Sequence, residues 1–118
     1  DGGRISRGAG MRVIFHPEFP QDVRRFADAY REISPKLAVR FHIEMEAAVE
    51  AVKHSPVSAG HYLNFGSKIV PELRRRNLRA FPFFILYGAT AEQLIFGSVL
   101  PSRSDPLTWL ARFPQAKR

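Results

Sequence analysis

Apolar residues in the first half of the chain recur every three or four positions, which predicts two amphipathic helices. The first helix begins near residues 17–20, since Pro20 is tolerated only in a first turn. Its apolar positions are Phe19, Val23, Phe26, Ala27, Tyr30 and Ile33. Ser34 ends this helix and can cap a second one, with Pro35 in the first helical position. Two helices joined this closely form an antiparallel hairpin, which needs another layer to cover its apolar face.

The second helix is predicted to reach about Lys53, before Pro56 stops it. Its apolar stripe consists of Leu37, Phe41, Met45, Ala48 and Val52, widened by Ile43 and Val49. Acidic residues of both helices are expected to face water, namely Glu18, Asp22, Asp28, Glu32, Glu44, Glu46 and Glu50.

The remaining apolar runs predict strands. Met11 to Phe15 precedes the helices, and Leu73 to Ala80, Phe81 to Tyr87 and Gln93 to Leu100 follow them, with a brief pairing possible at His61 to Phe65. The run from Phe81 to Tyr87 is almost wholly apolar, so it should be a central strand buried on both faces, with Tyr87 in the core. We therefore predict an α+β fold of order β-α-α-β-β-β, with the helical hairpin packed on a small twisted antiparallel sheet. Trp109 should fold back on it as a C-terminal anchor.

A length of 118 residues suits one domain. Residues 1–10 are rich in glycine and hold one large apolar side chain, so we expect a flexible leader or tag followed by a single domain over residues 11–118. The chain has no cysteine, which excludes a disulfide framework and a thiol nucleophile. No apolar run approaches the roughly 20 residues of a membrane span, so we expect a cytoplasmic protein with no membrane partner.

Basic residues exceed acidic ones, and the formal net charge is +7. The excess is local, since residues 61–80 carry +4 and residues 101–118 carry +3. It consists mainly of Lys68, Arg74, Arg75, Arg76, Arg79, Arg103 and Arg112. On the predicted strand, Arg75 and Arg79 would share one face and Arg74 and Arg76 the other. Arginine binds both phosphate and carboxylate through paired hydrogen bonds, so we expect a nucleic acid or an acidic protein as partner.

Other chemistry finds little support in the sequence. His42 and Glu46 have helical spacing suited to a shared metal ion, but nothing adds a third ligand. The chain has no glycine-rich phosphate loop and no Gly-x-Ser-x-Gly element. We therefore predict no metal and no cofactor.

Several motifs, in this order, resemble those of the RelE/ParE superfamily of bacterial toxins, and most closely its ParE-like, plasmid-stabilisation branch. They are Val13-Ile14-Phe15-His16-Pro17-Glu18; Ser34-Pro35 with Phe41 and Glu44; Leu73-Arg74-Arg75; Phe81-Pro82-Phe83 with Tyr87; and Arg103, Asp105, Pro106, Trp109 and Arg112. Together they cover nearly the whole chain after residue 10.

The resemblance implies the toxin of a type II toxin–antitoxin module. Such a toxin is neutralised by a cognate antitoxin, often acidic, that wraps around it. Operator DNA would be contacted only through the toxin–antitoxin complex. RelE-like members cut mRNA on the ribosome without a metal, whereas ParE-like members are reported to inhibit DNA gyrase.

The choice between these branches depends on proton-transfer residues, because metal-free RNA cleavage needs a base, an acid and positive charge at the phosphate. Arg75 and Arg103 match the basic positions of the RelE-like pattern and would be catalytic only in a ribonuclease. The sequence departs from the pattern at Asn77, Phe84, Pro101 and Trp109. We therefore favour a toxin that binds gyrase, with the ribonuclease and a generic nucleic-acid-binding domain as alternatives. The residues expected to bind the target or antitoxin are Arg74, Arg75, Arg76, Arg79, Arg103, Trp109 and Arg112.

Overall fold

The computed structural model describes residues 11–63 and 72–113, so the predictions for residues 1–10 and for Lys68 lie outside the described part. The elements are β1 (Arg12–Phe15), α2 (Phe19–Ile33), α3 (Pro35–His54), β2 (His61–Leu63), β3 (Glu72–Asn77), β4 (Phe83–Ala89), β5 (Gln93–Pro101) and a short 3-10 helix, η2 (Pro106–Arg112). This order confirms the predicted α+β fold, with the brief strand β2 added.

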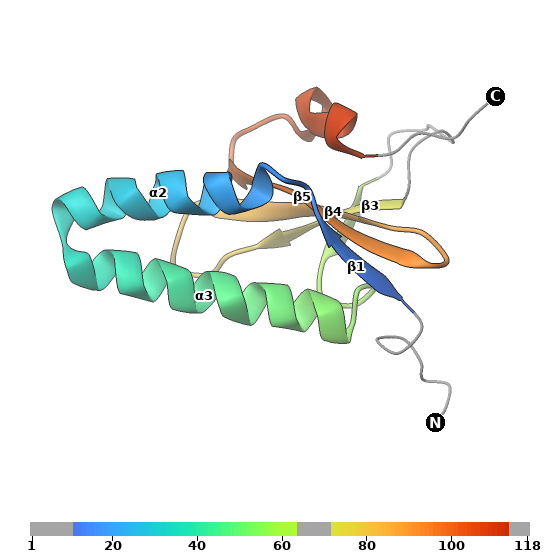
Figure 1. Ribbon diagram of the computed structural model, residues 1–118, viewed down its shortest axis with the longest axis horizontal. Helices are drawn as coiled ribbons and strands as arrows, with labels where there is room; N and C mark the ends of the chain where they lie inside the picture. Colours follow the sequence, from blue (N-terminus) through green and yellow to red (C-terminus); the bar gives the residue numbers. More distant parts are fainter. Residues whose placement is uncertain (1–10, 64–71, 114–118) are drawn as a thin grey trace.

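The two helices form the predicted hairpin and lie side by side (Figure 1). Ser34 separates them with an extended backbone, and its hydroxyl accepts a hydrogen bond from the Lys36 backbone N–H at 3.2 Å. Pro35 occupies the first position of α3, as predicted. In the described part, no helix is both long and apolar enough to cross a membrane.

The sheet has the strand order β1-β5-β4-β3-β2, which makes β4 the central strand as predicted. The sheet was predicted to be antiparallel but is mixed, because β1 runs parallel to β5 while the other neighbours are antiparallel. β4 begins at Phe83, two residues later than predicted, since residues 79–82 make the turn from β3. The turn is closed by the Leu78 N–H, which donates to the Phe83 carbonyl at 2.9 Å.

One face of the sheet packs against the helices. Buried side chains of α2 and α3 meet those of β4 and β5 in this core, among them Phe41, Val52, Ile85, Tyr87 and Phe96. Tyr87 is fully buried, as predicted, and its hydroxyl donates to the Pro56 carbonyl at 2.6 Å. Ile43 was expected to widen the apolar stripe of α3, but its side chain points away from this core and is 61% exposed.

The opposite face of the sheet is covered by the end of the chain. Leu73, Phe84, Leu86, Ile95 and Leu100 form a second apolar cluster, onto which Phe113 folds. Trp109 of η2 packs against the same cluster, which confirms it as a C-terminal anchor. Gly97 makes room for this packing, because a Cβ at this position would lie 2.4 Å from the Phe113 ring. The sheet is therefore apolar on both faces, and two different segments cover it.

Candidate functional site

The arginines of β3 are divided between the two faces of the sheet. Arg75 pairs with Leu86 of β4, whereas Arg74 and Arg76 pair with Tyr87 and Ile85. Cross-strand partners point to the same side, so Arg75 lies on the face covered by η2 and the other two lie on the helix side. The alternation predicted from the sequence is confirmed for these three residues.

Arg74 and Arg76 hold the segment that follows α3. The Arg74 guanidinium donates to the carbonyl of Val57 at 3.1 Å and forms an ion pair with Glu72. It also lies over the Tyr62 ring, 5.3 Å from the centroid. Arg76 donates to the carbonyl of Ala59 at 2.9 Å. Both side chains therefore have internal partners, which limits what they can offer to another molecule.

Arg75 lies flat against an aromatic ring on the other face. Its guanidinium carbon is 3.7 Å from the centroid of Phe84, and its Nε donates to Asn77 Oδ1 at 3.0 Å. Partial burial lowers the pKa of Arg75, although arginine remains charged at neutral pH. Asn77 and Phe84, two departures from the ribonuclease pattern, are thus the residues that position this arginine.

Arg79 and Arg103 are the most accessible of the predicted arginines, since both side chains are exposed in turns. Arg79 is not on the strand face predicted for it, because β3 ends at Asn77. Glu44 of α3 fixes its turn by accepting from the backbone N–H groups of Arg79 and Ala80. Glu44 was expected only to face water. It instead ties α3 to the connection between β3 and β4.

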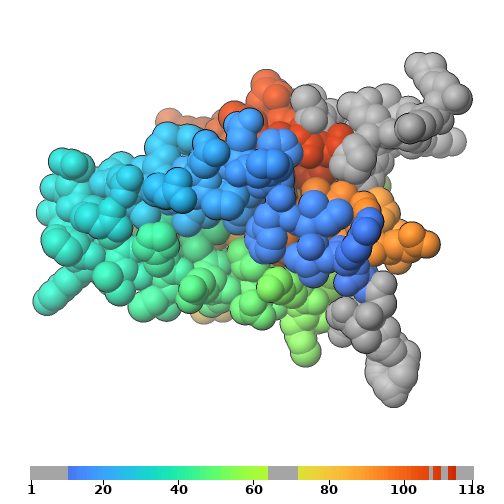
Figure 2. Space-filling view, viewed as in Figure 1, coloured from blue at the N-terminus to red at the C-terminus, as the bar shows by residue number. Residues whose placement is uncertain are grey.

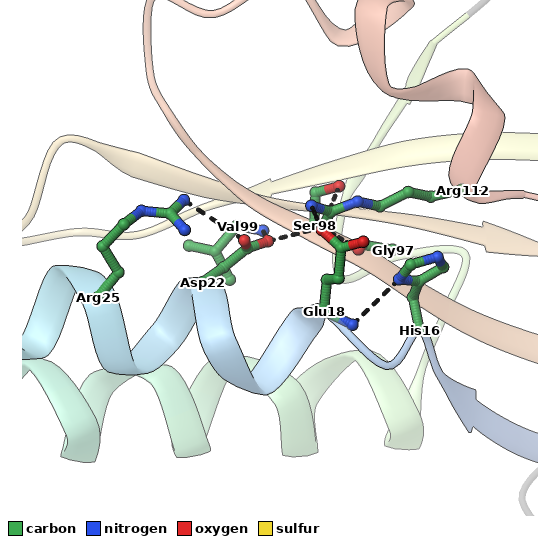
Figure 3. A network of polar contacts seen from close by, with 8 residues as sticks. All are labelled: His16, Glu18, Asp22, Arg25, Gly97, Ser98, Val99 and Arg112. Atoms are coloured by element: carbon green, nitrogen blue, oxygen red, sulfur yellow. Dashed lines mark hydrogen bonds and ion pairs between the residues drawn. The ribbon is translucent and has the colours of Figure 1, made fainter.

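Arg112 belongs to an internal polar network (Figure 3). Its guanidinium donates to Asp22 Oδ2 at 2.8 Å, to the Gly97 carbonyl at 2.9 Å and to Glu18 Oε1 at 3.0 Å. It also lies 4.7 Å from the Trp109 ring centroid. Only 10% of the Arg112 side chain is exposed. The structure therefore places this predicted binding residue in a structural ion pair.

Asp22 was wrongly expected to face water, for its side chain is only 2% exposed. Besides Arg112, it accepts from the Val99 backbone N–H at 3.1 Å and from Arg25 at 3.4 Å. The helical pattern places Asp22 on the polar side of α2, but β5 and η2 cover that side. No local pattern could have revealed this, since Asp22 and Arg112 are 90 positions apart.

An open groove that the sequence did not reveal lies where α2, α3 and the end of β1 meet. It measures about 700 Å³ and is lined by Phe15, Phe19, Pro20, Val23, His42, Met45, Glu46, Val49 and Glu50. Figure 2 shows this face of the molecule, with α2 and α3 side by side and β1 at one end. Phe15 is 39% exposed, which is unusual for a phenylalanine. The groove is apolar along its floor, while His42, Glu46 and Glu50 form its polar rim on α3.

Tyr87 is not available for acid–base chemistry in this arrangement. Burial raises the pKa of Tyr87 to about 12, partly offset by Arg74 and Arg76, and its hydroxyl is bonded within the core. Among residues 11–63 and 72–113, no group of three or more metal-ligating side chains could hold a metal ion. The predicted site thus divides into three partly buried arginines with internal partners, one stacked arginine and two exposed arginines.

The architecture defines a class of fold, a helical hairpin on one face of a five-stranded mixed sheet. A solved structure with this fold is a chain described as the chromosomal ParDE TA system from P. aeruginosa. The likeness has a TM-score of 0.63 at 18% sequence identity and covers 78% of this chain and 96% of that chain. No protein-family model matches the sequence, and no curated protein matches it. The comparison therefore shows a ParE-like fold.

Proposed function

We propose that this protein is the toxin of a type II toxin–antitoxin module. The observation that carries the proposal is the likeness to a chain of a ParDE toxin–antitoxin system, which spans 96% of that chain. The sequence motifs from Val13 to Arg112 support it independently, because they occur in the order typical of RelE/ParE toxins.

A cognate antitoxin would occupy the groove between α2 and α3. The groove has an apolar floor and lies between two helices, which suits an amphipathic helix that binds through residues spaced three or four apart. Glu46 and Glu50 on the rim would pair with basic residues of that helix. The acidic part of an antitoxin would instead find its partners at the exposed arginines Arg79 and Arg103.

The toxin would act by binding its target, as ParE-like proteins do on DNA gyrase. Tyr87 cannot exchange a proton with a substrate near neutral pH, because it is buried and its pKa is about 12. Arg79 and Arg103, the two exposed arginines of the predicted set, supply positive charge for recognition, and Arg75 adds a third charge on the face of the sheet opposite the helices. Such a toxin would work in the cytoplasm without a cofactor.

The test compares two activities of the purified protein. Supercoiling by gyrase should be inhibited, whereas mRNA on translating ribosomes should stay intact. Arg79→Ala/Arg103→Ala should weaken the inhibition, and Arg24→Ala, an exposed arginine on α2, serves as the matched control. Ribosome-dependent cleavage that disappears in Arg75→Ala and Arg103→Ala would contradict binding as the mechanism and favour the ribonuclease.

The toxin assignment itself is tested in cells. Induced expression should arrest growth, and co-expression of the product of the adjacent gene should relieve the arrest. Val23→Glu places a charge in the groove and should abolish relief without abolishing folding, because Val23 is only partly buried. Growth that is unaffected by the wild-type protein at a confirmed expression level would contradict the assignment.

A further inference from the structure

The outward face of α3 presents an apolar centre between two charged ends. Val39 and Ile43 lie one turn apart on this helix and are 57% and 61% exposed. The exposed residues along this face are Lys36, Val39, Arg40, Ile43, Glu46, Ala47 and Glu50. In Figure 1 and Figure 2 this helix is the lower of the two helices. Two adjacent β-branched side chains on a solvent face contribute nothing to the core of this chain.

The charges on this face have a fixed order. Lys36 and Arg40 lie toward the N-terminus of α3, whereas Glu46 and Glu50 lie toward its C-terminus. The interaction with the helix dipole would favour the reverse order, so the dipole of α3 does not account for it. Glu50 forms an ion pair with Lys53 at 3.3 Å, yet its side chain remains 71% exposed and can reach a second cation.

Reversing the helix about Ile43 maps every residue of this face onto a complementary one. Lys36 falls on Glu50, Arg40 on Glu46 and Val39 on Ala47, while Ile43 falls on itself. An antiparallel pair of identical helices related by a twofold axis produces this mapping. In such a pair, residue i of one copy contacts residue j of the other, and residue j of the first copy contacts residue i of the second. Basic residues meet acidic residues on both sides of a small apolar centre.

We propose that a second copy of this chain packs on α3, forming an antiparallel twofold dimer centred on Ile43. The surface area buried by a single pair of helices is smaller than the roughly 1,200 Å² buried in a standard stable interface. The dimer therefore dissociates on dilution. The surface is distinct from the groove apart from Glu46 and Glu50, which line both. The proposal stands independently of the toxin assignment, since it rests on the residues of α3 alone.

Sedimentation of the purified full chain, between about 10 µM and about 1 mM, measures the dimer. The wild-type protein should shift from monomer to dimer, and added salt should weaken the shift. Lys36→Glu/Arg40→Glu gives an acidic face and Glu46→Lys/Glu50→Lys gives a basic one. Each variant alone should stay monomeric, and a mixture of the two should form a heterodimer.

The controls separate this surface from general charge effects. The variant that carries all four substitutions, and so reverses the charge at both ends of the face, should dimerise as the wild type does. Arg24→Glu changes an exposed arginine on α2 and should leave the dimer unchanged. Circular dichroism verifies that every variant folds. A wild-type protein that is monomeric at about 1 mM, or charge variants that dimerise alone as well as the wild type, would overturn the proposal.

Discussion

Replacing Arg112 by alanine tests how the end of the chain is fastened to the domain. The substitution removes the cation that joins η2 to α2 and β5, because Arg112 donates to Asp22, Gly97 and Ser98. Asp22 then loses its closest charged partner while its side chain stays only 2% exposed. A buried carboxylate without a full set of partners destabilises the folded state.

The size of the expected loss of stability follows from the burial of the ion pair between Asp22 and Arg112. Removing one partner of a buried ion pair costs about 3–5 kcal/mol. Asp22 keeps the Val99 N–H and Arg25, so we expect the lower end, about 3 kcal/mol. The ion pair with Glu18 adds little, since the Glu18 side chain is 58% exposed. A loss of about 3 kcal/mol is a large part of the stability of a domain, which is typically about 5–15 kcal/mol.

Urea unfolding measures this cost with two signals. Trp109 is the only tryptophan of the chain, so its fluorescence reports on η2, while circular dichroism reports on the helices. In Arg112→Ala, the midpoints of both transitions should move to a lower urea concentration. Arg25→Ala is the matched control, because Arg25 contacts the same carboxylate from an exposed position and should cost at most about 1 kcal/mol.

Two results would refute this reasoning. The ion pair would be energetically unimportant if Arg112→Ala cost no more than Arg25→Ala. A double-mutant cycle with Asp22→Asn that showed additive losses would lead to the same conclusion, since coupled partners give non-additive ones.

Three further substitutions probe the packing around the sheet. Gly97→Ala should lower the free energy of unfolding by about 1–3 kcal/mol, because its Cβ would overlap the buried Phe113 ring, and a thermal melt measures the loss. The folded pKa of Tyr87 is raised from 10.0 to about 12, so its contribution to stability is complete below pH 10 and is lost as the pH rises through 12. Tyr87→Phe should remove that part of the decline in stability and the tyrosinate absorbance that appears near pH 12. Glu44→Ala should cost about 1.5–3 kcal/mol in urea unfolding, because two backbone N–H groups lose a charged acceptor, whereas the exposed Glu46→Ala should cost far less.

The sequence predicts the fold well where the signals are local. Ser34 and Pro35 mark the helix boundary through capping chemistry that acts over two residues, and the structure has that cap. The apolar run of β4 requires burial on both faces, which makes it the central strand. The parallel pairing of β1 with β5 does not follow from any local pattern, because it joins segments far apart in the sequence.

The candidate site is less predictable for the same reason. Arg74 and Arg112 read as surface cations, but backbone carbonyls and a buried carboxylate from distant segments use their donors. Periodicity shows which side of a helix a residue occupies, without showing what covers that side. This is why Asp22 is buried although it lies on the polar side of α2, and why Ile43 is exposed although it is apolar.

The parallel pairing of β1 with β5 also governs the order in which the chain can fold during its synthesis. Among the strands that the structure describes, β1 leaves the ribosome first, yet its partner β5 leaves last. The helical hairpin can form early because its contacts are close in sequence, whereas the sheet cannot close until β5 has been made. A chain interrupted before β5 would therefore leave β1 without a partner and expose the part of the helical hairpin that β5 covers, and exposed segments of this kind are removed by proteases.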